Sequence, residues 1–340
     1  MKNLYLLKII LINFLVFLFV YTILEIFTGQ IIFKKKLKCS YILCNANYTY
    51  KTSLYTKEKI TIKYKKDKYG FRGRYKPINQ IDILTMGGST TDERYLNLND
   101  TWSEQLELNF KKNNKSIDVV NAGIDGQSSF GHIWNFKNWI NKIEGFSAKY
   151  ILFYIGVNEK NYSGRHDFNP NEVSYPKKIL YLLKYNDGIT NKIYEFVVHR
   201  YNPVDELNVA HSKYRSPNYL SIKKNDPDEF ERLEENIEEL IKLSKVLNAK
   251  PIFFTQKTLR WKKIENNLFS ISSDTDFYSR EKKISDLIIN TCRRHDAICV
   301  NGFEIINFNE LDTYDLVHTT PVGSKKIADV LFNKLNAIKF

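Results

Sequence analysis

Four short segments, far apart in the chain, carry the groups that could attack an ester. They are Gly87-Gly88-Ser89-Thr90-Thr91, Asn121-Ala122-Gly123, Gly156-Val157-Asn158-Glu159 and Asp315-Leu316-Val317-His318. Together they offer a hydroxyl, a glycine N–H, a carboxamide and an Asp/His pair. Acyl-ester chemistry needs a nucleophile, a general base with an orienting carboxylate, and donors for the oxyanion that forms.

Ser89 is the candidate nucleophile. It follows an apolar run and two glycines, which permit a tight turn and the close approach of a substrate. A helix N-cap is the alternative for this segment taken alone, because Thr90, Thr91 and Asp92 also cap helices well. A phosphate-binding loop is not favoured, since the P-loop spacing and its lysine are missing.

Asp315 and His318 are the candidate orienting acid and general base. They stand three residues apart, so a helical turn between them would place both side chains on one face. The carboxylate would then orient the imidazole toward Ser89. Taken alone, a histidine at this position also fits an ordinary polar surface residue.

Gly123 and Asn158, with the amide of Ser89, are the candidate oxyanion donors. A glycine N–H can face a cleft with no side chain in the way, and an asparagine amide is a neutral donor. Both residues also fit simple turns, since Asn and Gly are common after strands.

The segments that must position these groups alternate between strand-like and helix-like patterns. Strands are expected at Ile81–Met86, Ile117–Val120, Tyr150–Ile155, Pro251–Thr255 and Ala297–Val300. Helices are expected at Trp102–Phe110, Phe130–Ile143, Pro227–Leu247, Ser279–Arg293 and Pro321–Leu335. This alternation predicts an α/β fold with a parallel five-stranded sheet, helices on both faces and a ligand at the C-terminal edge of the strands.

The N-terminal segment is apolar almost throughout. Ile9–Leu24, or Leu4–Phe27 with two charged residues included, can cross a hydrocarbon core of about 30 Å as a helix. No small-residue cleavage site follows, so residues 1–28 are predicted to be a transmembrane signal anchor that is not removed. A buried core helix is the alternative.

Two further regions follow the anchor, and the second contains an insertion. Residues 29–75 are predicted to be a polar connector that ends in the turn Tyr69–Gly73, and residues 76–340 a hydrolase domain. Residues 160–225 interrupt its rhythm and are too long for an ordinary loop. This insertion, with helix-like pieces at Lys178–Tyr185 and Ile193–His199, is expected to be a lid or a structural addition packed away from the site.

Charge and cysteine content bear on location and partners. The formal net charge is +13, but the lysines do not cluster on a nucleic-acid module, so we expect no nucleic-acid partner.

Lysines directly after the anchor favour a cytoplasmic domain by the positive-inside rule, although long domains translocate largely regardless of charge. Cys39/Cys44 and Cys292/Cys299 lack the usual zinc spacing and fit either short-range disulfides or free thiols. We expect a single-pass membrane protein with an extracytoplasmic domain.

The four segments resemble the blocks of the SGNH/GDSL hydrolase family, and Tyr69–Gly73 and Thr101-Trp102 resemble pieces of its membrane-anchored bacterial members. The resemblance implies a flavodoxin-like three-layer α/β/α fold with no metal and no organic cofactor. It implies Ser89, His318 and Asp315 as catalytic triad, and Ser89, Gly123 and Asn158 as oxyanion hole. Two departures stand out: Gly88 replaces the usual acidic residue, and Glu159 stands where aspartate is common.

The function expected on this basis is that of a serine esterase. It would hydrolyse O-acyl esters, O-acetyl esters among them, on a cell-envelope glycan or lipid. One alternative is an O-acyltransferase that passes the acyl group to a glycan hydroxyl and depends on a multi-span partner. The other is a non-catalytic basic module that binds anionic glycan or lipid on a degenerate hydrolase scaffold.

Overall fold

The computed structural model describes residues 2–28, 42–161, 227–264, 267–270 and 277–338, together with Ile189 and Ile193. The chain divides into two compact units. Helix α1 (Lys2–Thr28), Ile189 and Ile193 belong to the first unit, and the other described residues from Cys44 onward belong to the second.

Helix α1 confirms the helix predicted at the N-terminus. Within it, Tyr5–Phe27 spans 23 residues with a mean hydropathy of 2.5. A helix of this length extends about 35 Å, enough for a hydrocarbon core of about 30 Å. Among the described residues it is the one helix long and apolar enough to cross a membrane.

The second unit is built on a parallel sheet. Its strands are β3 (Ile81–Gly87), β4 (Val119–Asn121), β5 (Ala148–Ile155), β6 (Lys250–Thr255) and β9 (Ile298–Val300). They lie in the order β4-β3-β5-β6-β9, and every neighbouring pair is parallel. The first strand of the sheet in the sequence therefore lies second from its edge, which is the flavodoxin-like order.

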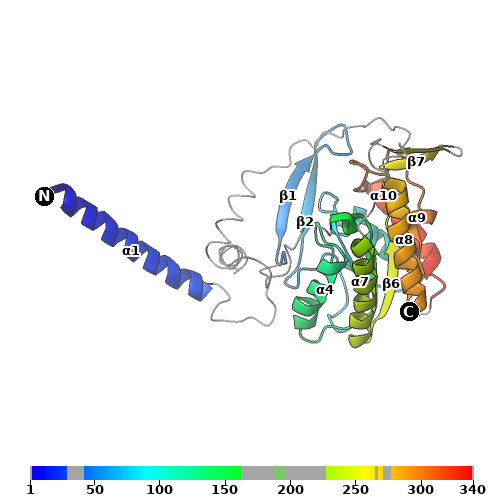
Figure 1. Ribbon diagram of the computed structural model, residues 1–340, viewed down its shortest axis with the longest axis horizontal. Helices are drawn as coiled ribbons and strands as arrows, with labels where there is room; N and C mark the ends of the chain where they lie inside the picture. Colours follow the sequence, from blue (N-terminus) through cyan, green and yellow to red (C-terminus); the bar gives the residue numbers. More distant parts are fainter. Residues whose placement is uncertain are drawn as a thin grey trace. The chain divides into compact units, whose positions relative to one another are not determined.

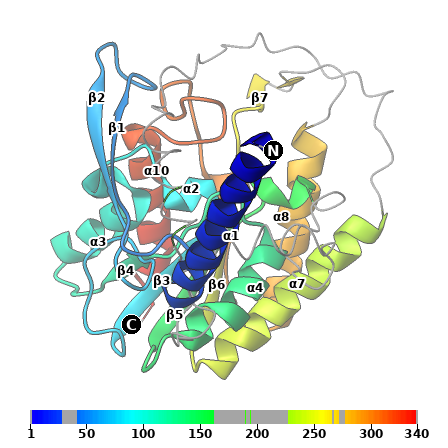
Figure 2. The ribbon, with the colours of Figure 1, turned by 90° about the vertical axis from the view of Figure 1, so that its left-hand side faces the viewer.

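Helices cover both faces of the sheet (Figure 2). Helices α3 (Trp102–Lys112) and α10 (Pro321–Leu335) pack on one face, where they share one core with strand residues such as Tyr150 and Leu152. Helices α4 (Ser129–Asn138), α7 (Pro227–Val246) and α8 (Phe277–Arg294) lie on the other. Shorter pieces are α2 (Ser89–Asp92), α9 (Gly302–Ile305), η1 (Leu98–Asp100), η2 (Ile140–Lys142) and η3 (Val157–Asn161). The three-layer α/β/α prediction is confirmed.

The predicted elements exist with small shifts at their ends. The helix expected at Phe130–Ile143 is divided, because α4 ends at Asn138 and η2 follows it. Strand β4 begins at Val119 rather than at Ile117. The predicted insertion 160–225, with its two helix-like pieces, lies almost entirely outside the described residues. The exceptions are residues 160 and 161, which end η3, and the single residues Ile189 and Ile193.

A hairpin precedes the sheet and corrects the predicted connector. Strands β1 (Asn47–Thr52) and β2 (Ile60–Lys65) pair antiparallel (Figure 1). Ile62 and Tyr64 point inward and are fully buried, whereas the alternate residues Lys63 and Lys65 are exposed. Residues 44–75 therefore fold as part of the sheet's own unit, because one face of the hairpin is apolar. A second hairpin, β7 (Trp261–Ile264) and β8 (Asn267–Ser270), follows β6.

Disulfide bonds replace the alternative of free thiols. Cys292 in α8 and Cys299 in β9 are bonded, with their Cα atoms 6.0 Å apart. Cys44 is also disulfide-bonded. Its predicted partner, Cys39, lies outside the described residues.

Candidate active site

The sheet topology gathers the predicted segments at one edge. Ser89 begins α2 immediately after β3, Gly123 follows β4, and Asn158 lies in η3 immediately after β5. The carboxyl ends of parallel strands meet at the same edge, where such sheets hold their ligands. The loop before α10 brings Asp315 and His318 to the same place.

Ser89, His318 and Asp315 form a continuous chain of hydrogen bonds. Ser89 Oγ lies 2.7 Å from His318 Nε2, and His318 Nδ1 lies 2.5 Å from Asp315 Oδ2. About a third of the histidine and aspartate side chains is exposed, so a substrate can approach the imidazole. The arrangement supplies a nucleophile, a base and a group that orients the base.

Asp315 shapes the loop as well as contacting the imidazole of His318. Its Oδ1 accepts from the backbone N–H groups of Val317 (3.1 Å) and His318 (2.7 Å), and Leu316 between them has φ +73°. The turn is therefore an Asx-type turn rather than the helical turn expected. Burial alone would raise the pKa of Asp315. The hydrogen bonds that its carboxylate accepts from the side chain and backbone of His318 hold this pKa below its usual range. The ring of Tyr314 stacks on the imidazole, with centroids 5.7 Å apart.

Asn158 reaches back to the nucleophile turn. Its Nδ2 donates to the carbonyl oxygen of Gln127 at 2.8 Å, which leaves one amide hydrogen for another acceptor. A Cβ built on Gly88 would lie 2.3 Å from this nitrogen. Glycine at position 88 therefore leaves room for the Asn158 amide next to the turn that carries Ser89. This explains why the acidic residue common in the family pattern is absent here.

Gly123, predicted as an oxyanion donor, is hydrogen-bonded in the structure. Its N–H donates to Asn121 Oδ1 at 2.9 Å and so already has an acceptor. Glycine is needed here for close packing, because an added Cβ would lie 2.3 Å from the backbone nitrogen of Asp92.

The strand order and the Ser–His–Asp geometry agree with the resemblance to SGNH/GDSL hydrolases seen in the sequence. No group of three His, Cys, Asp or Glu side chains that could hold a metal ion occurs among the residues described.

Comparisons with known proteins give distant structural likenesses. No protein-family model and no curated protein matches the sequence. Similar solved structures include TesA, with 10% identity, a TM-score of 0.45, and coverage of 75% of this chain and 97% of that one. An esterase, EstA from Pseudoalteromonas sp., has 13% identity, a TM-score of 0.43, and coverage of 76% and 97%. A lipolytic protein of the G-D-S-L family from Veillonella parvula has 13% identity, a TM-score of 0.44, and coverage of 76% and 100%.

Glu159 explains the second departure from the SGNH pattern. Its two carboxylate oxygens accept from the backbone N–H of Ser129 (2.8 Å) and from its hydroxyl (2.7 Å). Asn236 of α7 donates to the same hydroxyl at 3.0 Å. The glutamate thus fixes η3, and with it Asn158, to the start of α4.

Gln256 is a supporting residue that the sequence reasoning missed. Its Nε2 donates to Thr90 Oγ1 at 2.6 Å, and its Oε1 accepts from the N–H of Val157 at 2.6 Å. It therefore ties the neighbour of Ser89 to the neighbour of Asn158. Its position directly after β6, at the same edge of the sheet, was the signal available.

Glu93 joins the nucleophile turn to the histidine loop. Its Oε1 accepts from Thr319 Oγ1 at 2.8 Å and from the Ser324 hydroxyl, and its Oε2 accepts from the N–H of Trp102 at 2.8 Å. Thr319 directly follows His318. Complete burial raises the pKa of Glu93 to about 7, although these hydrogen bonds oppose the rise.

This pKa predicts a pH dependence of stability. Between the ordinary value of 4.5 and about 7, the folded state binds more protons than the unfolded state, so the free energy of unfolding falls as pH rises. Glu93→Gln removes this titration. We expect the unfolding midpoint of the wild type, relative to that of Glu93→Gln, to decrease between pH 4.5 and pH 7.5 in thermal scans. Midpoints that run parallel across that range would contradict the assignment.

Proposed function

We propose that this chain is a membrane-anchored serine esterase that hydrolyses O-acyl esters, O-acetyl esters among them, on a cell-envelope glycan or lipid. The observation that carries the proposal is the hydrogen-bonded chain from Ser89 through His318 to Asp315. The non-catalytic basic module offers no reason for these three side chains to converge.

The proposed mechanism follows from this geometry. His318 Nε2 takes the proton of Ser89 Oγ as the oxygen attacks the ester carbonyl carbon, and Asp315 stabilises the imidazolium. The N–H of Ser89, unpaired at the start of α2, and the free amide hydrogen of Asn158 would hold the oxyanion. His318 then gives its proton to the leaving alcohol. Water, deprotonated by the same imidazole, releases the acyl group and restores the serine.

The proposed location and substrate class depend on helix α1 and on the disulfide bond. The length and hydropathy of α1 support an anchor that keeps the domain at a membrane surface. The Cys292–Cys299 disulfide favours an oxidising compartment and hence an extracytoplasmic domain. Acylated glycans and lipids of the envelope are the ester substrates that we propose for that location.

Covalent labelling of Ser89 tests the proposal. Full-length protein in detergent is treated with a fluorophosphonate, in which Ser89 Oγ bonds to phosphorus, fluoride leaves and His318 accepts the proton. We expect peptide mass spectrometry to find the adduct on Ser89, and no such adduct in Ser89→Ala. A wild-type protein without this adduct would refute the proposal.

The acyltransferase alternative shares the acyl-serine and is distinguished by its acceptor. With an acetyl ester as donor and an oligosaccharide added, an esterase releases acetate whatever the oligosaccharide concentration. A transferase instead yields acetylated oligosaccharide at the expense of acetate.

A further inference from the structure

A buried ion pair lies directly behind the nucleophile turn. Lys66, the residue after β2, and Asp92, the last residue of α2, have their Nζ and Oδ1 atoms 3.1 Å apart. Both side chains are almost fully covered, with exposed fractions of 2% and 1%. The mechanism proposed above uses neither of them.

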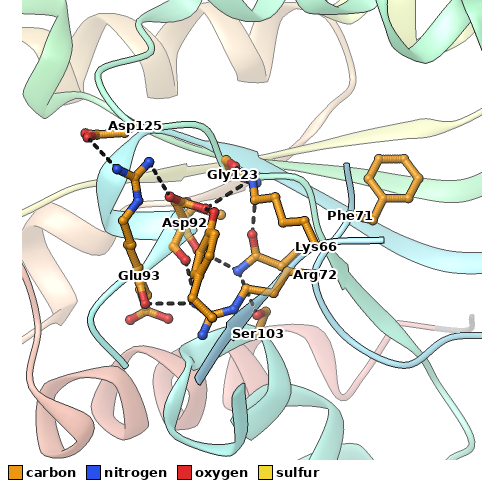
Figure 3. A network of polar contacts seen from close by, with 12 residues as sticks. Lys66, Phe71, Arg72, Asp92, Glu93, Ser103, Gly123 and Asp125 are labelled. Atoms are coloured by element: carbon orange, nitrogen blue, oxygen red, sulfur yellow. Dashed lines mark hydrogen bonds and ion pairs between the residues drawn. The ribbon is translucent and has the colours of Figure 1, made fainter. Parts of the chain in front are cut away.

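Lys66 joins two segments of the site. Its Nζ also donates to the carbonyl oxygen of Gly123 at 2.6 Å, so one ammonium group contacts both the nucleophile helix and the loop after β4 (Figure 3). The two segments touch each other too, because Gly123 packs against the backbone of Asp92. The distance between this helix, which begins with Ser89, and the loop that contains Gly123 therefore fixes the position of Ser89 relative to that loop.

Asp92 is held by further side chains, most of them from the segment around β2. Tyr64 donates its hydroxyl to Asp92 Oδ1 at 2.6 Å, and Arg72 donates to the Asp92 carbonyl oxygen at 2.7 Å. Arg94 lies 3.5 Å from Oδ2. Burial alone would raise the pKa of Asp92, but the charges of Lys66 and Arg94 and the Tyr64 hydroxyl hold it below the usual range. The carboxylate therefore stays ionised inside the protein.

A gain in folding stability alone does not explain why a buried ion pair is present at this place. Taking two charges out of water carries a desolvation cost that their attraction often fails to repay, and replacing both by apolar side chains is frequently neutral or stabilising. A charged pair that contacts two catalytic segments is better explained by the positions in which it holds them.

We propose that Lys66 and Asp92 are positioning residues, which fix the nucleophile turn against the Gly123 loop and so set the geometry of the ester-cleaving site. The inference rests on the proposed function. It makes the segment from β1 to Arg72 a part of the catalytic unit, although this segment precedes the sheet.

Two variants of the full-length protein separate positioning from folding. Lys66→Met leaves the Asp92 charge without its lysine and is expected to lower both the unfolding midpoint and the reaction rate. Lys66→Met/Asp92→Leu removes both charges and is expected to recover the midpoint. In that double variant we expect kcat, and the rate of Ser89 labelling by fluorophosphonate, to remain about 10- to 100-fold below wild type with KM little changed.

Lys76→Met is the matched control. Lys76 also contacts a buried aspartate, Asp82, and donates to a backbone carbonyl, that of Ser116 at 3.0 Å, but at the opposite end of β3. It is expected to change the midpoint and not the labelling rate. A double variant that labels at the wild-type rate, or that fails to fold, contradicts the positioning role. Absence of labelling in the wild type contradicts the esterase proposal instead.

Discussion

Replacing Ser89 with alanine is expected to lower kcat/KM for a small acetyl ester by roughly 10⁴- to 10⁶-fold. His318→Ala should cost a similar factor, because Ser89 Oγ then has no base at the 2.7 Å distance seen here. The double variant should be no slower than either single variant, since the two groups act as one unit. Steady-state kinetics on the three proteins, with circular dichroism to confirm folding, measures the effect.

Ser116→Ala is the control for the serine substitution. Ser116 is exposed and lies just before β4, at the opposite end of the sheet from Ser89. It should retain wild-type kinetics. If Ser89→Ala hydrolyses the acetyl ester at the wild-type rate, another group is the nucleophile. If the double variant loses the product of the two single factors, the residues do not act as a unit.

The convergence of Ser89 and His318 depends on how α10 docks. Helix α10 packs on α3, where the rings of Phe110 and Phe332 meet edge-to-face at 5.4 Å. Asn109 also donates to Asp329 Oδ1 at 2.8 Å across this contact. Since α3 follows α2 in the chain, this packing carries the loop before α10 to the nucleophile turn. Glu93 then fastens the loop to the turn.

The sheet and its helices could be predicted because their pattern is local. Strands covered on both faces appear as short apolar runs, and the helices between them have clear apolar faces. Parallel connection then places Ser89, Gly123 and Asn158 at one edge without any further information. The order of the elements alone therefore predicts that these three residues lie at the same edge of the sheet.

What the sequence could not predict depends on side-chain direction and burial. Lys66 and Arg72 are buried, yet in a lysine-rich segment they look like the exposed Lys63 and Lys65. The alternation in Ile60–Lys65 was a strand signal, but its apolar half is short. The hydrogen bond of the Gly123 N–H could not be predicted, because its acceptor is a neighbouring side chain, here that of Asn121.

Asn158→Ala is expected to lower kcat by about 10²- to 10³-fold with KM little changed. The carboxamide leaves one N–H free beside Ser89, and a donor to the oxyanion acts more strongly in the transition state than on the neutral ester. Asn158→Asp should be at least as slow, because it replaces the donor by a negative charge next to the developing oxyanion. Measuring kcat and KM separately on a soluble acetyl ester distinguishes loss of transition-state binding from loss of substrate binding.

Asn138→Ala provides the matched control for this substitution. Asn138 also donates its Nδ2 to a backbone carbonyl, that of Trp134 at 2.9 Å, but it is exposed at the end of α4. Its loss should leave both kinetic constants unchanged. An Asn158→Ala variant that raises KM and keeps kcat would show that the amide binds the substrate rather than the oxyanion. The N–H of Ser89 would then be the donor that remains.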